Sequence, residues 1–264
     1  MPTAPRRLAA DAIRPGDVGP GGLRHVQIGA ANIPYLLAGG DAFLRAAAQL
    51  RPDRWILVSN DEPGLGRIAG RVADGLATLA PVERIAIGDG EAAKSLDTVG
   101  TVCARAVDAG ATRASVVVAV GGGNVCNVAG LCAALLFRGV RLVQVPTTLI
   151  GMSDVVLSLK QGVNFAGVKN GLGTYLAPDL IWADPDALRT LPPREIRAGQ
   201  AEIIKNALII APGQIPVLTD LFRSDARYDT DTLSGFIELA IAAKSLVLGA
   251  DARERLSALV LEYG

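Results

Sequence analysis

The amino-acid sequence predicts an α/β protein with a parallel sheet, followed by an all-helical region. Up to about residue 183, short runs of apolar and β-branched residues alternate with alanine-rich segments of helical spacing. Parallel strands need a crossover of that length between them, so the alternation favours right-handed βαβ units. After Ala183 the apolar residues keep only the helical spacing. We therefore expect a Rossmann-like sheet domain first and helices after it.

Five runs predict strands, because each is rich in Val, Ile, Leu or aromatic residues and ends near a turn. They are 35–39 (YLLAG), 55–60 (WILVSN), 82–88 (VERIAIG), 114–120 (ASVVVAV) and 142–148 (LVQVPTT). The segments 41–50, 66–80, 95–110 and 127–139 have helical spacing and end near glycine. Ligands of such sheets bind beyond the carboxyl ends of the strands.

Three regions follow from this pattern. Residues 1–22 are expected to be a flexible leader, 23–183 an α/β domain, and 184–264 part of a helical domain. Helices are predicted in the last region over 188–210, 231–251 and 254–263. The chain stops at Gly264 directly after an apolar helical pattern, so we expect the helical domain to be incomplete.

The composition excludes several classes of function. Lys and Arg together number 26, as do Asp and Glu, so no charge excess favours nucleic acid or an anionic membrane. No apolar run is long enough to cross a bilayer, and the N-terminus lacks the apolar core of a secretory signal. The three cysteines form no metal pattern, which favours buried thiols in a reducing cytoplasm. The single histidine, His25, is expected to be exposed or hydrogen-bonded rather than catalytic.

The triplet Gly121, Gly122 and Gly123 leaves a predicted strand and enters a helix. Two explanations stay open. Glycines let backbone N–H groups approach a pyrophosphate at a helix start, but a tight turn can also be chosen for packing. The spaced G-x-G-x-x-G of the common dinucleotide fold is absent.

Charged residues in apolar surroundings give further candidates. Residues 153–170 carry several polar side chains on the predicted ligand side of the sheet, which suits binding an anion or a polyol. Glu202 and Lys205 share one face of an apolar helix. Two interpretations stay open: the residues form an ordinary ion pair, or Glu202 is a metal ligand. The full set of candidates at this point is Asp154, Lys160, Asn164, Lys169, Asn170, Glu202, Lys205, Lys244 and Glu262.

These pieces together resemble the sugar phosphate cyclases, the superfamily of 3-dehydroquinate synthase. The resemblance runs from roughly Tyr35 to Gly264. The segments that carry it, in order, are GEAAK (90–94), the glycine triplet, RGVRLVQVPTT (138–148), SLKQGVN (158–164), VKN (168–170), LRTLPPREIRAG (188–199) and AEIIKNAL (201–208). The segments SLKQ, DARY (225–228), KNAL and LVLEYG (259–264) are most similar to the branch that forms 2-deoxy-scyllo-inosose. Glu262 stands where dehydroquinate synthases usually have asparagine.

The resemblance implies a dehydroquinate synthase-like fold and an NAD site. The pyrophosphate of NAD would meet the glycine triplet, and the adenosine ribose would meet Asn60 and Asp61. The other implied cofactor residues are Glu91, Lys94, Thr147, Thr148, Asp154, Lys169 and Asn170. Glu202 would be a ligand of a divalent metal, zinc or cobalt. Lys160, Lys205, Lys244 and Glu262 would be catalytic, with Lys160 and Asn170 also binding substrate. Arg138 would reach the substrate phosphate across the interface of a homodimer.

The reaction implied by the resemblance converts D-glucose 6-phosphate to 2-deoxy-scyllo-inosose plus phosphate, a step of aminoglycoside antibiotic biosynthesis. NAD takes hydride from C4, the ketone acidifies the C5 proton, and phosphate is eliminated. The hydride then returns, and the opened sugar closes by an intramolecular aldol addition. Metal and lysines suit this chemistry because they stabilise developing negative charge.

Two departures from the family pattern bear on activity. Cys126 replaces a glycine in the helix start and is expected to crowd it. The family's histidine metal ligands begin immediately after the equivalent of LVLEYG, where this sequence ends, so we expect little or no cyclase activity from the 264 residues. Two alternatives remain: a dehydroquinate or 2-epi-5-epi-valiolone type of cyclase, and a non-catalytic NAD-binding paralogue or dimerisation partner.

Overall fold

The computed structural model describes residues 22–37, 39–60 and 63–262. The expected leader, apart from Gly22, and Asp61 lie outside the described residues. One sheet contains β1 (Leu23–Ile28), β2 (Ala31–Leu37), β3 (Trp55–Asn60), β4 (Val82–Ile87), β5 (Val116–Gly121), β6 (Arg141–Pro146) and β9 (Leu180–Ala183). Its order is β1-β2-β9-β6-β5-β3-β4, with only the β1–β2 pair antiparallel. The predicted parallel α/β sheet is confirmed.

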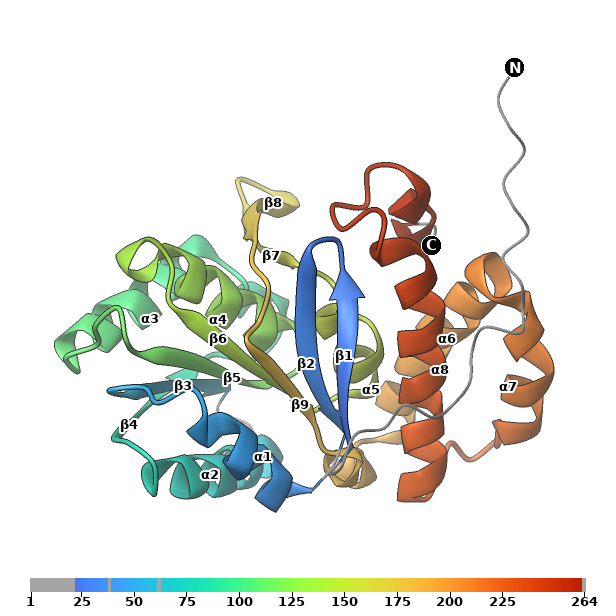
Figure 1. Ribbon diagram of the computed structural model, residues 1–264, viewed down its shortest axis with the longest axis horizontal. Helices are drawn as coiled ribbons and strands as arrows, with labels where there is room; N and C mark the ends of the chain where they lie inside the picture. Colours follow the sequence, from blue (N-terminus) through green and yellow to red (C-terminus); the bar gives the residue numbers. More distant parts are fainter. Residues whose placement is uncertain (1–21, 38, 61–62, 263–264) are drawn as a thin grey trace.

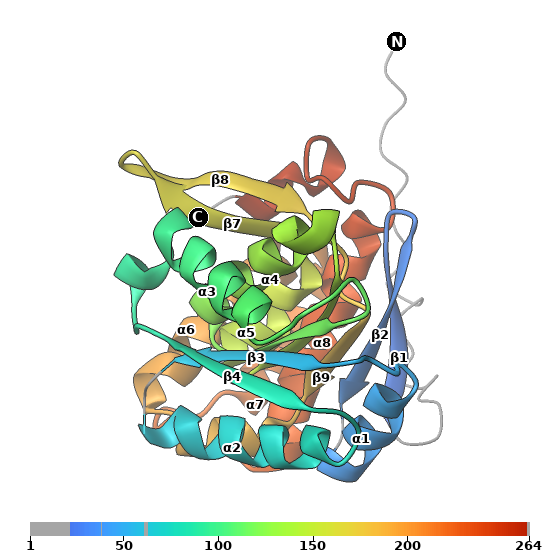
Figure 2. The same cartoon turned by 90° about the vertical axis from the view of Figure 1, so that its left-hand side faces the viewer.

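The described helices of the first part cover both faces of this sheet (Figures 1 and 2). Helices α1 (Gly40–Ala48) and α2 (Pro63–Ala77) lie on one face, and α3 (Leu96–Asp108) and α4 (Gly123–Leu135) lie on the other. Side chains of one strand alternate between the faces: Trp55 and Leu57 pack with the first pair of helices, Ile56 with the second. Strands buried on both faces explain why their sequences are continuous apolar runs.

The sequence-based prediction missed four strands, β1, β7 (Lys160–Phe165), β8 (Val168–Tyr175) and β9. Strand β1 alternates exposed polar and buried apolar residues, so it lacks an apolar run. Strands β7 and β8 form a separate antiparallel hairpin within the segment 153–170 and just beyond it. Strand β9 has only four residues. The predicted strand 35–39 in fact begins at Ala31 and ends at Leu37.

After Ala183 the described residues contain helices and no strand. They form α6 (Pro193–Ile210), α7 (Ile215–Leu221), α8 (Thr230–Leu248) and several 3₁₀ turns. The predicted helix over 254–263 is instead a 3₁₀ segment, Ser257–Glu262. Helix α8 lies beside the β1–β2 hairpin, and α6 and α8 both contact α5 (Leu149–Ser153) (Figure 1). The domain boundary near Ala183 stays a prediction, because these helices pack on the same core as α4.

The order of the strands determines where a ligand can bind. The chain runs outward from β3 to β4 and then returns past β3 to β5 and β6. The strand order therefore reverses between β3 and β5, the kind of place where open α/β sheets bind ligands. The glycine triplet follows β5 at this point, and residues 147 and 148 follow β6 beside it.

Candidate functional site

Helix α4 begins at the glycine triplet with free backbone donors. Its N-cap is Gly122, which has no side chain to accept the first N–H groups, and its first turn contains no acidic residue. The helix is 13 residues long, so its N-terminus carries the partial positive charge of a regular helix. Such a helix start, without its own cap, suits an anionic ligand.

The three positions of the triplet differ in why they hold glycine. A Cβ on Gly121 would lie 2.7 Å from the Cβ of Val125, and one on Gly123 would lie 3.2 Å from Val155. Packing therefore accounts for glycine at these two positions. A Cβ on Gly122 would only touch the Thr148 methyl at 3.4 Å, an ordinary contact, and the backbone there has a negative φ of −76°. Glycine at 122 is thus the one of the three that packing does not demand.

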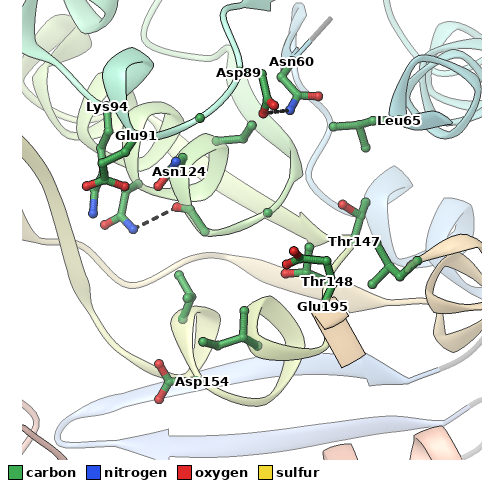
Figure 3. A pocket seen from close by; sticks show the side chains of 18 of the residues that line it. Asn60, Leu65, Asp89, Glu91, Lys94, Asn124, Thr147, Thr148, Asp154 and Glu195 are labelled. Carbon is green, nitrogen blue, oxygen red and sulfur yellow. Dashed lines mark hydrogen bonds between the residues drawn. The ribbon is translucent and has the colours of Figure 1, made fainter. Parts of the chain in front are cut away.

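A cavity of about 1170 Å³ opens in front of this turn. Figure 3 shows labelled side chains around the start of α4, with Asn60 and Asp89 joined by a hydrogen bond of 2.8 Å beyond β3 and β4. The volume and the mixture of apolar and polar walls suit a dinucleotide with part of a substrate. The predicted residues that line it are Asn60, Glu91, Lys94, Gly122, Gly123, Thr147, Thr148, Asp154, Lys160, Lys169 and Asn170.

The β7–β8 hairpin forms one wall of the cavity through a chain of hydrogen bonds. Asn164 donates to the Glu91 carboxylate at 2.7 Å and accepts from the Asn170 backbone at 2.9 Å. Lys94 in turn donates to the Asn170 side chain at 2.5 Å. Residues from two distant segments are therefore joined in one unit, Glu91 and Lys94 in or next to a 3₁₀ turn (Glu91–Ala93) and the asparagines in the hairpin.

Lys94 has an unusual environment for a lysine. It is only 6 % exposed, although it lines the cavity. Burial lowers the pKa of its ammonium, the nearby Lys169 lowers it further, and Glu91 partly offsets both. An incoming phosphate would favour the charged form of Lys94 and would relieve the repulsion between the two lysines.

A second cluster joins α5 to the helical part of the chain. The Lys244 ammonium on α8 lies 2.5 Å from the Asp154 carboxylate and also donates to the Asp154 carbonyl at 3.1 Å. Lys205 on α6 lies 2.5 Å from the Glu202 carboxylate and donates to the carbonyl of Leu261 at 2.6 Å. Of these residues only Asp154 lines the cavity, so the predicted group of Glu202, Lys205 and Lys244 stands behind it.

The two carboxyl groups of this cluster differ in their pKa. Burial raises the pKa of Asp154, but the charges and hydrogen bond of Lys244, with Lys205, outweigh it, so the pKa lies below its ordinary value. Burial and the charge of Asp154 raise the pKa of Glu202, and the lysines offset this only in part. Glu202 therefore takes up a proton before Asp154 does, and it can donate that proton to Asp154 in a hydrogen bond.

The described residues do not form a complete metal site. Among them, no group of three or more His, Cys, Asp or Glu side chains could hold an ion. The predicted ligand Glu202 has Asp154 nearby, but both carboxylates are engaged by ammonium groups. Zinc usually takes four ligands, three of them from protein even in catalytic sites. A metal bound here would need ligands beyond this pair.

One functional candidate was missed from the sequence. Glu254 is 7 % exposed and accepts hydrogen bonds from the Lys160 ammonium at 2.8 Å and from the Ser158 hydroxyl at 3.0 Å. Lys160 lies at the cavity wall, so Glu254 orients the ammonium from behind. The two residues are 94 positions apart, and the helical spacing assumed for 254–263 gave no sign of this pairing.

Some predicted residues lie elsewhere. Arg138 is exposed, has a positive φ of 70°, and does not line the cavity of its own chain. Gly121 ends β5 behind the cavity wall. Glu262 belongs to the last 3₁₀ segment, but its side chain is outside the described part of the chain. Cys126 points into the core rather than the cavity, with its sulfur 3.8 Å from the Gly121 carbonyl, and α4 starts regularly around it.

Comparison with known proteins places this site in context. The family described as 3-dehydroquinate synthase N-terminal matches residues 84–198. The 2-deoxy-scyllo-inosose synthase of Streptomyces lividus is 54 % identical over 175 residues, which are 66 % of this chain and 46 % of that protein. The 2-deoxy-scyllo-inosose synthase of Micromonospora echinospora is 43 % identical over 244 residues, 90 % of this chain and 60 % of that protein. The chain thus spans about half the length of the curated relatives it matches.

Solved structures agree with the sequence comparison. A crystal structure of 2-deoxy-scyllo-inosose synthase complexed with carbaglucose-6-phosphate, NAD⁺ and Co²⁺ superposes with a TM-score of 0.85. It is 34 % identical in sequence, and the match covers 91 % of this chain and 67 % of that one.

Proposed function

The chain belongs to the 3-dehydroquinate synthase-like family, in which its relatives are 2-deoxy-scyllo-inosose synthases, and on this premise we propose that it serves the same reaction. The substrate would be D-glucose 6-phosphate, and the products 2-deoxy-scyllo-inosose and phosphate. The observation that carries the proposal is the cavity at the glycine turn, whose walls combine an uncapped helix start with lysines from the hairpin.

NAD fits the sheet side of the cavity. The N–H groups at the start of α4 would hold the pyrophosphate, since Gly122 leaves them accessible. Asn60 and Asp89, already joined to each other, would receive the adenosine ribose beyond β3 and β4. Lys94 and Lys169 would neutralise phosphate charge. When bound, NAD would supply the reversible hydride acceptance that makes the C5 proton of the sugar acidic.

The hairpin and α5 would hold the sugar phosphate. Lys160 presents an ammonium to the cavity, and Glu254 keeps it oriented, so it suits a phosphate or a developing oxyanion. Asp154 is held ionised by Lys244 and can accept a hydrogen bond from a sugar hydroxyl. Asn170 completes this wall beside Lys94. In a complete cyclase that contains this chain, phosphate release from glucose 6-phosphate, compared with that from the heptulosonate phosphate and sedoheptulose 7-phosphate, tests the assignment. Release from another substrate alone would refute it.

Replacing Gly122 with aspartate separates the two explanations of the glycine turn. Aspartate is a good N-cap and the backbone there is already extended, so the melting temperature should hold or rise. Its carboxylate would occupy and repel the pyrophosphate position, so NAD affinity should fall at least tenfold. Calorimetric titration with NAD and a thermal melt measure both. Unchanged NAD affinity would contradict the placement of the pyrophosphate at this helix start.

Zinc gives a second test. The two described carboxylates are paired with lysines, so we expect no stoichiometric zinc to remain on the 264-residue chain after dialysis. Metal analysis by mass spectrometry measures this directly. One equivalent of retained zinc or cobalt would contradict the expectation and would favour an active cyclase. Loss of the metal on dialysis would mean that these two carboxylates do not hold it by themselves.

We also propose a homodimer, located in the cytoplasm. Exposed Arg138 follows the exposed apolar side chains Leu135 and Phe137, at 53 % and 36 % exposure, on a surface away from its own cavity. An interface there would let Arg138 reach the phosphate site of the second copy. Light scattering should give twice the 27.3 kDa chain mass, and Phe137→Asp should shift it toward the monomer. None of the described helices is both long and apolar enough to cross a membrane.

A further inference from the structure

Two of the three cysteines lie against each other in a part of the fold that the proposed reaction does not use. The sulfur of Cys103 on α3 is 3.3 Å from the sulfur of Cys132 on α4. Both thiols are free, and the third, Cys126, is separate and fully buried. A disulfide holds its sulfurs about 2 Å apart, so the two sulfurs would have to approach by roughly 1.3 Å.

The two thiols have unequal environments. Cys103 is half-buried and therefore within reach of a small solute, whereas Cys132 is packed in the core between the helices. A hydrogen bond with Cys132 lowers the pKa of Cys103, and the same interaction, followed by burial, raises the pKa of Cys132. The reachable thiol is thus also the one that ionises more easily, which is the arrangement of an attacking and a resolving cysteine.

We propose that Cys103 and Cys132 form a reversible disulfide when the chain meets hydrogen peroxide, clamping α3 to α4. The Cys103 thiolate attacks one peroxide oxygen: an S–O bond forms, the O–O bond breaks, and the departing hydroxide takes a proton to become water. The Cys132 sulfur then attacks the Cys103 sulfur. An S–S bond forms, the S–O bond breaks, and the second hydroxide leaves as water with the Cys132 proton. Two thiols are oxidised and one peroxide is reduced.

The disulfide would stabilise the packing of α3 against α4, the helix that follows the glycine turn. The bond would close a loop between residues 29 positions apart, which restricts the unfolded chain. Cys132 lies in the third turn of α4, well beyond Gly123 at its start, so the bond would pin the helix body and not the helix start. The oxidised chain should melt roughly 5–10 °C above the reduced chain.

Intact mass spectrometry of the full chain tests the proposal. After brief peroxide treatment, the mass should fall by about 2 Da and the thiols counted after unfolding should drop from three to one. Peptide mapping should join the segments that contain Cys103 and Cys132, and dithiothreitol should restore all three thiols. Three unreacted thiols, or added oxygen on Cys103 without a cross-link, would overturn the proposal.

Two variants keep the result interpretable. Cys103→Ser changes a half-buried side chain conservatively and should abolish both the loss of mass and the rise in melting temperature. Cys126→Ala leaves the pair intact and should still form the cross-link. A cross-link that survives in Cys103→Ser would show that another pair is responsible, and an oxidised chain that melts no higher than the reduced one would contradict the clamp.

Discussion

Lys244→Met should destabilise the chain by about 3 kcal/mol at neutral pH, because it leaves the carboxylate of Asp154 without its partner. Lys244 is 4 % exposed and joins α8 to the end of α5 through two hydrogen bonds to Asp154. Methionine fills a similar volume, so the loss reports mainly the unpaired charge. Breaking a buried ion pair costs about 3–5 kcal/mol. The lower figure applies here, since the Asp154 side chain is 28 % exposed. Urea unfolding measures the change.

The loss of stability in Lys244→Met should become smaller as the pH falls. In the parent chain the pKa of Asp154 is below its ordinary 3.8, so the pair contributes stability above that pH and loses it as the pH falls further. In the variant, burial is opposed only by the charge of Lys205 and the hydrogen bond of Glu202, so the pKa of Asp154 rises. Its ionised form then costs stability at pH 7, and protonation removes that cost as the pH falls into the acid range. The free energies of unfolding of the parent chain and the variant should therefore become more similar as the pH falls.

Two comparisons make this test specific. Adding Asp154→Asn to Lys244→Met should recover much of the lost free energy, since the uncompensated charge is then gone. Lys169→Met removes an exposed lysine at the cavity wall and should change stability by less than about 0.5 kcal/mol. The loss of stability in Lys244→Met could be the same at neutral and at acid pH, or Asp154→Asn could fail to reduce it. Either result would mean that packing around Lys244 causes the loss instead.

The parallel sheet was predictable because its central strands are buried on both faces. Such strands appear in the sequence as apolar runs, and β3 was located to the residue. The hairpin β7–β8 was not found, since nearly all of β8 is exposed and its sequence, VKNGLGTY, has neither an apolar run nor alternation. The short β9 is fixed by its pairing with β2 and β6, which local sequence does not encode.

The candidate site was predictable where a motif lies in one segment. Most of the cofactor residues proposed from the resemblance line one cavity, because the ends of neighbouring parallel strands meet at one edge. The pairing of Glu254 with Lys160 was missed, and so was the engagement of Lys244 by Asp154, although both lysines had been singled out. These contacts join residues 90 or more positions apart, so they depend on how α8 and the segment after it pack, which periodicity alone cannot give.

Gly199→Ala should destabilise the chain by about 2–3 kcal/mol, because α6 crosses α5 at this glycine with no room for a methyl group. A Cβ there would lie 2.6 Å from the Cγ of Leu149 and 2.8 Å from the backbone nitrogen of Ile150. Leu149 is fully buried and the second contact is main chain, so neither can move aside cheaply. Helix α5 would have to shift, together with Thr148 before it and Asp154 after it, both at the cavity. NAD affinity should therefore fall with stability.

Gly235→Ala is the matched control, since it makes the same change inside another helix of the same region. Nothing lies within 4 Å of a Cβ at Gly235 on α8, so alanine there should raise stability by about 0.5–1 kcal/mol through its better helix propensity. Opposite signs for one substitution at two glycines would isolate the close approach of α5 and α6 from any general effect of alanine. If both variants were stabilised, α6 could not lie as close to Leu149 as the structure has it, and the wall of the cavity that α5 provides would have to be placed differently.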